Sequence, residues 1–335
     1  MRIGFICDQE TCLSGKSNGI RMQALIWKAA LEQNGFVVDL ISPWGDYNWA
    51  TFDIIHIFSF ADSISIVEEL HRRGCKIVIS PIIDTIQSKW KYRLFSHWGS
   101  KKLRLSSTAF YLRSKKEYFD LFYARSRYEA EYIHYCFDVP YTKILTIPLS
   151  YRSEFHAINF SKKENFCLHV SSITQNRKNV MRLIKAAIKY NFNLVLAGSK
   201  GSPEAYAPFA ELISGHDNIK VLGFVSDTDL TNLYNRAKVF ALPSINEGVG
   251  LVALEAAVHG CGIVITTIGG PKEYFPSDMS YHVNPFSIDD IGLAVKRAFD
   301  NPHQPTLCDY IAERFGIDET IKSLIASYNN LVKDK

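Results

Sequence analysis

Two glutamates bracket a glycine-containing turn in the second half of the chain. The segment runs from Glu247 through Gly248, Val249 and Gly250 to Glu255. The glycines remove side chains where a helix is expected to begin, so backbone N–H groups can face a diphosphate, and the helix dipole adds positive potential. Since an α-helix rises about 1.5 Å per residue, the carboxylate of Glu247 can reach a sugar while that of Glu255 reaches a ribose.

Two cations, Arg177 and Lys178, follow an expected strand over 166–170. Because ligands of open α/β sheets bind at the carboxyl ends of the strands, these cations could oppose the glycine turn and neutralise a leaving diphosphate. The spacing of the two glutamates carries little weight alone, because 16 Glu in 335 residues make such a pair expected by chance. The ordinary alternative is a βα turn with Glu247 near the helix start and Glu255 on a solvated face.

The elements that must position these residues alternate along the chain. Short β-branched runs are separated by longer helical patterns, which predicts parallel sheets covered by helices. A polar stretch over 148–163 predicts a linker, so we expect an N-terminal domain over 1–150 and a C-terminal domain over 151–315. Apolar spacing predicts a helix over 316–335 that packs back on the N-terminal domain. The expected strands are 3–7, 37–41, 54–58, 77–80, 144–147, 166–170, 194–197, 220–222, 239–242 and 263–266.

The composition is that of an ordinary folded protein, with 47% hydrophobic residues and a net charge of +4. The start of the sequence lacks the basic leader and apolar core of a secretory signal, and no apolar stretch approaches the roughly 20 residues that cross a bilayer. We therefore expect a cytoplasmic protein, with any membrane association peripheral on the inner face. Seven cysteines without a C-x-x-C pair predict reduced core thiols rather than disulfides or metal ligands.

Together these segments make residues 166–285 resemble the donor half of the retaining family 4 glycosyltransferases. Members have the GT-B fold, an α/β fold of two Rossmann-like parallel-sheet domains facing across a cleft. The resemblance implies that Glu247 contacts hydroxyls of the donor sugar, that Glu255 binds the ribose, and that Lys178 with Arg177 binds the diphosphate. It implies donor contacts for further loop residues: Gly15, Gly19, Gly223, Phe224, Val225, Gly248, Val249, Gly250 and Leu251.

The sequence departs from the family pattern at two places. Ser172 stands where relatives carry a basic residue six positions before the lysine, and Arg177 is the possible substitute. Ile82 and Ile83 follow the strand 77–80, where many relatives carry a His that contacts the donor sugar. Asp84 or His56 could take that role, although His56 is equally well interpreted as a core residue.

The resemblance implies transfer of a hexose-type sugar from a nucleotide diphosphate sugar to a hydroxyl of a glycan or glycolipid. It implies retention at the anomeric carbon, no metal or other cofactor, and a role in bacterial-type surface polysaccharide synthesis. Two alternatives stay open: a catalytically silent binding or scaffold protein, and a sugar-nucleotide epimerase. A P-loop is disfavoured because Glu10 occupies its first glycine position, and a nicotinamide enzyme because no G-x-G-x-x-G follows the first strand.

Basic and aromatic residues interleave over 89–127. Basic residues with aromatics suit anionic lipid headgroups, so this segment predicts contact with an anionic membrane surface. The alternative is a solvated face whose aromatics turn inward. No nucleic-acid partner is expected, because no binding module accompanies the charge. The segment contains two acidic residues, Glu117 and Asp120. It contains eleven basic residues: Lys89, Lys91, Arg93, Lys101, Lys102, Arg104, Arg113, Lys115, Lys116, Arg125 and Arg127.

Overall fold

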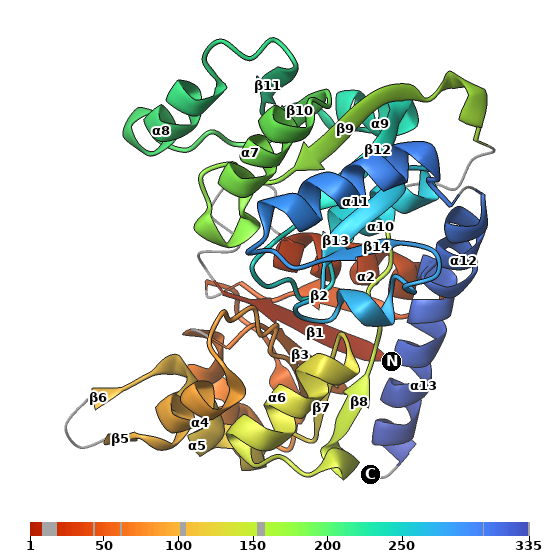
Figure 1. The fold of residues 1–335 in the computed structure, drawn as a ribbon. Helices are drawn as coiled ribbons and strands as arrows, with labels where there is room; N and C mark the ends of the chain where they lie inside the picture. The colour runs from red at the N-terminus through yellow and green to blue at the C-terminus, as the bar shows by residue number, and fades with distance from the viewer. Residues whose placement is uncertain are drawn as a thin grey trace. The chain divides into compact units, whose positions relative to one another are not determined.

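The protein is described by a computed structural model over residues 1–8, 19–42, 44–60, 62–100, 105–152, 158–303 and 305–333. It divides into two compact units, one of Met1–Leu149 with Ile317–Lys335 and one of Ser150–Gly316. The chain therefore leaves the first unit and returns to it at its C-terminal end. Each unit holds a six-stranded parallel sheet, which confirms the predicted pair of α/β folds (Figure 1).

The first unit has the strand order β2-β1-β3-β4-β7-β8. All five residues of the central strand β3 are buried, as a parallel sheet covered on both faces requires. The short strand β7 was not predicted, because its four residues lie inside the basic and aromatic segment. The strands are β1 (Arg2–Cys7), β2 (Val37–Leu40), β3 (Ile54–Phe58), β4 (Lys76–Ser80), β7 (Leu121–Ala124) and β8 (Ile144–Thr146).

Helices cover this sheet, and a small antiparallel pair, β5 (Gly99–Ser100) with β6 (Leu105–Ser106), follows the helix α4. In Figure 1, α4 and α5 lie beside α6. The helices of the first unit are α2 (Gly19–Gln33), α3 (Val67–Arg72), α4 (Lys89–His97), α5 (Thr108–Lys115), α6 (Arg127–Phe137) and α13 (Ile317–Lys333).

The C-terminal helix α13 is tied to the first unit by buried hydrogen bonds. The Tyr328 hydroxyl lies 2.6 Å from His56 Nδ1, and Ser327 Oγ lies 2.8 Å from the Tyr123 hydroxyl. His56 Nε2 is bonded to Ser80 Oγ at 2.9 Å. Burial lowers the pKa of His56 to about 3. His56 is therefore a neutral core residue with both ring nitrogens engaged, rather than a ligand contact.

The second unit has the strand order β11-β10-β9-β12-β13-β14. The amphipathic helices α7 and α11 bury their apolar sides in one core cluster with this sheet. The strands are β9 (Glu164–Val170), β10 (Leu194–Ala197), β11 (Ile219–Gly223), β12 (Ala237–Leu242), β13 (Gly262–Thr266) and β14 (Tyr281–Val283). The helices are α7 (Val180–Tyr190), α8 (Pro203–Ile213), α9 (Asp227–Arg236), α10 (Leu251–Val258), α11 (Ile288–Asp300) and α12 (Thr306–Arg314).

Two of the eleven cations counted over 89–127 are buried, so they are not available to a membrane surface. Lys115 is buried and its ammonium group is 2.9 Å from Glu68. Arg125 is buried between Glu129 and Asp84, with Nη2 at 2.8 and 2.9 Å from their carboxylates. Long basic side chains can bury when a carboxylate accompanies them. Residues 101–104 lie outside the described ranges.

Six cysteines lie in the described ranges, and all are free thiols. Five of these are buried, among them Cys167 in β9 and Cys261 before β13. Cys12 falls outside the described residues. Within those ranges, no helix combines the length and the apolar content that crossing a membrane requires.

Candidate functional site

Glu247 lies on the loop that follows β12, at the carboxyl end of the sheet. Its N–H donates to the Ile268 carbonyl at 3.3 Å, and its carbonyl accepts from the Gly270 N–H at 3.1 Å. These bonds join the loop after β12 to the loop after β13. Gly269 lies opposite with φ of +110°, and a Cβ there would stand 1.9 Å from the Glu247 carbonyl oxygen. The close approach of two backbones therefore requires glycine at this position.

The two predicted cations converge on the side chain of Glu247, a residue that is 6% exposed. Lys178 Nζ donates to Glu247 Oε2 at 2.7 Å, and Ser244 Oγ donates to the same oxygen at 3.0 Å. Arg177 Nη1 lies 3.5 Å from Oε1 and donates to the Asn246 carbonyl at 3.1 Å. Two cations against one carboxylate leave a formal charge of +1, which favours an anionic ligand.

Asn179 positions these cations, a role that the sequence interpretation did not give it. It has the left-handed φ of 60°, which Asn tolerates better than most residues, and it ends the short 3₁₀ turn Asn176–Lys178. Its buried amide donates to the Pro243 carbonyl at 2.8 Å and to the Pro285 carbonyl at 2.6 Å. The turn that carries Arg177 and Lys178 is thereby fixed to the strand ends around Glu247.

His169 in β9 connects this strand to β12, the strand that precedes the Glu247 loop. Its ring nitrogens lie 2.7 Å from the Ala241 carbonyl of β12 and 2.7 Å from Ser171 Oγ. Burial lowers the pKa of His169 to about 4, and the positive charge of Lys178 also lowers it. His169 is therefore a neutral structural residue.

The glycine turn leads directly into α10. Gly250 precedes the helix with φ of +87°, and no side chain of the described residues caps the helix start. The first N–H groups of an uncapped helix need another acceptor, and the helix dipole favours an anionic one. Gly248, Val249 and Gly250 are buried, and Leu251 is half-buried. The predicted donor-binding turn is thus brought together with Glu247, Lys178 and Arg177 in one unit.

Glu255 has different surroundings. It lies on α10 with 2% of its surface exposed, and its carboxylate forms a two-pronged ion pair with Arg152. Arg152 Nη2 is 3.0 Å from Oε2, and the Tyr234 hydroxyl donates to the same oxygen at 3.2 Å. A ribose could bind Glu255 only by sharing or displacing these donors. Arg152 escaped the sequence interpretation because it lies in the stretch assigned to the linker.

The predicted base loop lies at the end of β11. Gly223 adopts φ of +74° and its carbonyl accepts from the Gly198 N–H at 2.7 Å. Phe224 is 76% exposed and Val225 is half-buried. The strand β11 is three positions from β12 in the sheet, or roughly 14 Å at about 4.8 Å per strand. This separation suits an elongated ligand lying along the carboxyl ends of the strands.

An Asp-x-Asp triplet, Asp227-Thr228-Asp229, follows this loop and had no place in the sequence interpretation. Its acids occupy the first turn of α9, where they complement the helix dipole. Asp229 Oδ2 accepts from the hydroxyl of the N-cap Ser226 at 2.7 Å. The triplet therefore has a structural explanation as a helix start.

The predicted contacts from the first unit are only partly described. Gly15 lies outside the described residues, while Gly19 begins α2. At the carboxyl end of β4, Ile82 has a left-handed φ of 55°, a strained conformation for a β-branched residue. Asp84 follows it as an exposed carboxylate that accepts from buried Arg125. Asp84 remains the candidate for the role of the missing family His.

Comparison with known proteins identifies the family of the second unit. Residues 151–315 match the family described as glycosyl transferases group 1, over nearly all of the second unit. This unit belongs to the group 1 glycosyltransferases. A glycosyltransferase of Methanocaldococcus jannaschii described as uncharacterized is 31% identical over 150 residues, which cover 43% of this chain and 38% of that protein. The serotype-specific mannosyltransferase WbdA of Escherichia coli is 26% identical over 216 residues, covering 56% of this chain and 26% of WbdA.

The group 1 assignment agrees with the fold of the whole chain. The structure of Anabaena HepE in complex with UDP and glucose matches with a TM-score of 0.70 at 14% identity, covering 98% of this chain and 100% of that one. This similarity confirms the GT-B fold. The matched regions span 38% and 26% of the lengths of the two sequence relatives, well under half of each.

Proposed function

We propose that this protein is a retaining glycosyltransferase that moves a hexose-type sugar from a nucleotide diphosphate sugar to a hydroxyl of a glycan or glycolipid. The observation that carries the proposal is the convergence of Lys178 and Arg177 on buried Glu247, beside the uncapped start of α10. The group 1 family of the second unit supports the reaction class.

The chemistry requires stabilisation of a departing diphosphate and of positive charge on the sugar ring. Preorganised cations and backbone N–H groups supply the first without a strong base. In the proposed complex, Lys178 transfers its hydrogen bond from Glu247 to the diphosphate, and Arg177 exchanges its ion pair with Glu247 for one with the same diphosphate. The freed carboxylate holds hydroxyls of the sugar. The proposal includes no metal ion or other cofactor, since these side chains and the N–H groups of 248–251 supply the charge stabilisation.

The acceptor and the biological setting are part of the same proposal. A hexose donor is supported by the UDP and glucose in the HepE structure, and a surface polysaccharide acceptor by the serotype-specific mannosyltransferase among the relatives. Phe224, exposed at the end of β11, offers a flat apolar surface to the nucleotide base.

The test begins with a thermal-shift panel of UDP-, GDP- and ADP-sugars, followed by transfer assays with the sugar that binds. Replacing Glu247 with Ala should reduce turnover by at least about a hundredfold, because a contact made in the transition state is lost, while donor affinity changes less. Glu247→Gln, which preserves the side-chain shape, should show the same separation. Glu164→Ala is the matched control, because Glu164 pairs with Arg236 at the amino end of β9 and is exposed.

The outcome also separates the rival activities. Undiminished turnover by both Glu247 variants would contradict the proposed site. Donor binding without transfer or hydrolysis would favour a scaffold protein, and interconversion of nucleotide sugars without an acceptor would favour an epimerase. Analysis of the anomeric configuration of the product tests retention, and assays with a chelator test metal independence.

A further inference from the structure

The helix α4 turns polar residues toward α6 and leaves its large apolar residues exposed, the reverse of an ordinary surface helix. Trp90, Leu94 and Trp98 are spaced four apart and so share one side, with Phe95 beside Leu94. All four are at least half exposed, and Trp98 is 78% exposed. We call these four residues the α4 outer face. A contiguous exposed apolar surface of this kind marks an interaction site.

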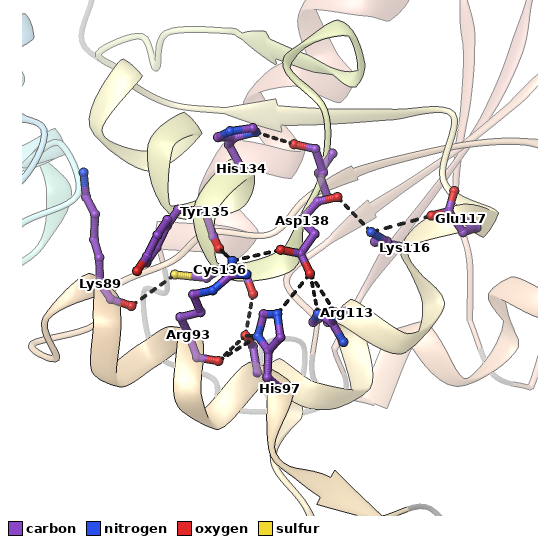
Figure 2. A network of polar contacts seen from close by, with 12 residues as sticks. Lys89, Arg93, His97, Arg113, Lys116, Glu117, His134, Tyr135, Cys136 and Asp138 are labelled. Atoms are coloured by element: carbon purple, nitrogen blue, oxygen red, sulfur yellow. Dashed lines mark hydrogen bonds and ion pairs between the residues drawn. The ribbon is translucent and has the colours of Figure 1, made fainter.

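The opposite side of α4 is fixed to the C-terminal end of α6 (Figure 2). Arg93 Nη1 is 2.8 Å from Asp138 Oδ1, and His97 Nε2 is 3.0 Å from Asp138 Oδ2. Arg113 of α5 donates twice to Oδ2, at 2.9 and 2.6 Å. Burial alone would raise the pKa of Asp138, but the hydrogen bonds from Arg113 and Arg93 outweigh it and lower this pKa to about 2. The aspartate is therefore charged at any physiological pH.

Further hydrogen bonds in Figure 2 join the same side of α4 to α6. Arg93 also donates to the Tyr135 carbonyl, Ser96 Oγ donates to the Cys136 carbonyl, and Cys136 Sγ lies 3.5 Å from the Lys89 carbonyl. Because Arg93, Ser96 and His97 are committed to α6, α4 cannot rotate to bury its tryptophans without breaking this network. The exposure of the α4 outer face is thus built into the fold of the first unit.

The segment that carries this face is basic. Residues 85–116 contain nine Lys or Arg and no Asp or Glu. Several of these cations are paired by carboxylates from other segments, as Lys89 is by Glu131. Lys91 is exposed on α4, and its ammonium group lies 5.5 Å from the Trp90 ring centroid. A basic group beside tryptophans matches the boundary of an anionic bilayer, where the ring enters the interface and the ammonium group meets the headgroups.

We propose that the α4 outer face docks on an anionic lipid bilayer, with Trp90, Leu94 and Trp98 entering the interfacial layer and Lys91 contacting the headgroups. The membrane contact predicted for residues 89–127 is thereby assigned to the α4 outer face alone. Docking of this face does not depend on the proposed sugar transfer. A bilayer is favoured over a second copy of the chain because the exposed Lys91 beside Trp90 would face a like charge in the copy, whereas it would face opposite charge on anionic headgroups.

The test is sedimentation of the full-length protein with vesicles made of equal parts phosphatidylglycerol and phosphatidylcholine, compared with vesicles of phosphatidylcholine alone. The wild-type protein should bind the anionic vesicles more strongly. The double variant Trp90→Ser with Trp98→Ser should lose at least about tenfold in affinity, since two interfacial anchors are removed. Lys91→Glu should weaken binding to the anionic vesicles, so the variant should bind anionic and neutral vesicles more nearly equally. Trp44→Ser is the matched control, because Trp44 is 96% exposed elsewhere in the first unit.

Two further measurements test whether the tryptophans enter the bilayer and whether the variant is folded. Quenching of wild-type tryptophan fluorescence by brominated lipids should exceed that of the double variant, and circular dichroism should show that the variant is folded. Equal binding of anionic vesicles by the wild-type protein and the double variant would overturn the proposal. So would a wild-type dimer in sedimentation velocity that the double variant abolishes while vesicle binding stays unchanged, because the face would then join two copies.

Discussion

Glu247 and Glu255 share a spacing motif but have different surroundings. Glu247 is held by two cations and a hydroxyl at an uncapped helix start, so a ligand phosphate can compete for its partners. Glu255 is 2% exposed and is held by Arg152, which has its own side chain 23% exposed. Glu255 thus fastens the start of the second unit to α10, whatever contact it makes with a ligand.

We expect Arg152→Ala to destabilise the second unit more than Glu255→Gln. The first change leaves a buried carboxylate with the Tyr234 hydroxyl as its remaining partner, which costs about 3 kcal/mol by the usual penalty for breaking a buried pair. The second removes the negative charge, keeps the hydrogen bond from Tyr234, and lets Arg152 turn to solvent, so its cost is about 1 kcal/mol. Denaturant unfolding of both variants measures the difference.

Arg236→Ala is the control for this comparison. Arg236 also forms a two-pronged pair, with Glu164, but both side chains are about half exposed. An exposed pair of this kind contributes about 0.5 kcal/mol or less. If Arg152→Ala were no more destabilising than Arg236→Ala, the pair between Arg152 and Glu255 would not be present in solution.

At the scale of elements, the position of Glu247 depends on the loop after β13. Gly269→Ala should therefore disturb the site through backbone geometry alone. Its Cβ would meet the Glu247 carbonyl oxygen at 1.9 Å, and backbone cannot yield as a side chain can. Turnover should fall by at least about tenfold, because a small misplacement of a positioning group has a large kinetic effect. Steady-state transfer assays and thermal unfolding of the variant provide the measurement.

Gly215→Ala is the control that has the backbone strain of a positive φ without a steric clash. Gly215 has a positive φ of 79° as well, but a Cβ there would have no neighbour within 4 Å. This control should lose about 1 kcal/mol of stability from the left-handed backbone and keep its activity. Equal activity of the Gly269 and Gly215 variants would mean that the two loops move apart easily and that Glu247 is not held by the loop after β13.

Elements with strong periodicity were predictable from the sequence, and short or mixed ones were not. The predicted strands 54–58 and 194–197 have the observed bounds, because 194–197 is a continuous apolar run and 54–58 is interrupted only by His56. Strands β7 and β14 were not predicted, because β7 lies inside the basic and aromatic segment and β14 has three residues with His282 at their centre. The convergence of Lys178 on Glu247 followed from the rule that parallel strands end at one edge. The pairing of Glu255 with Arg152 could not be predicted, because Arg152 lies 103 positions away in a polar stretch without a pattern.

At the scale of the whole molecule, each unit has a buried neutral histidine on a central strand. His56 links β3 to β4 and to α13 in the first unit, and His169 links β9 to β12 in the second. Each ring satisfies its neighbours with both nitrogens, so protonation would place a charge in a core and disrupt a hydrogen-bond pattern. Protonation of these rings is therefore expected to destabilise both units.

We expect both units to lose stability as the pH falls below 6.5. Burial lowers the pKa from 6.5 to about 3 for His56 and to about 4 for His169, so between these values the unfolded chain binds protons that the native units do not. The free energy of unfolding then decreases with falling pH by up to about 1.4 kcal/mol per pH unit for each histidine. The loss ends near pH 4 in the second unit and near pH 3 in the first. Asp138, with its pKa lowered to about 2, adds a further loss only below its ordinary 3.8.

Native-state hydrogen exchange in β3 and β9 between pH 7 and pH 5 follows each unit separately, because each strand lies in one core. After correction for the intrinsic exchange rate, His56→Gln should flatten the pH dependence of opening in β3, and His169→Gln should flatten it in β9. Each substitution lowers overall stability, so the slope and not the absolute stability is the quantity compared. His216→Gln, a partly exposed histidine after α8, should leave both slopes unchanged. A slope in β9 that persists in His169→Gln would assign the acid sensitivity of the second unit to other groups.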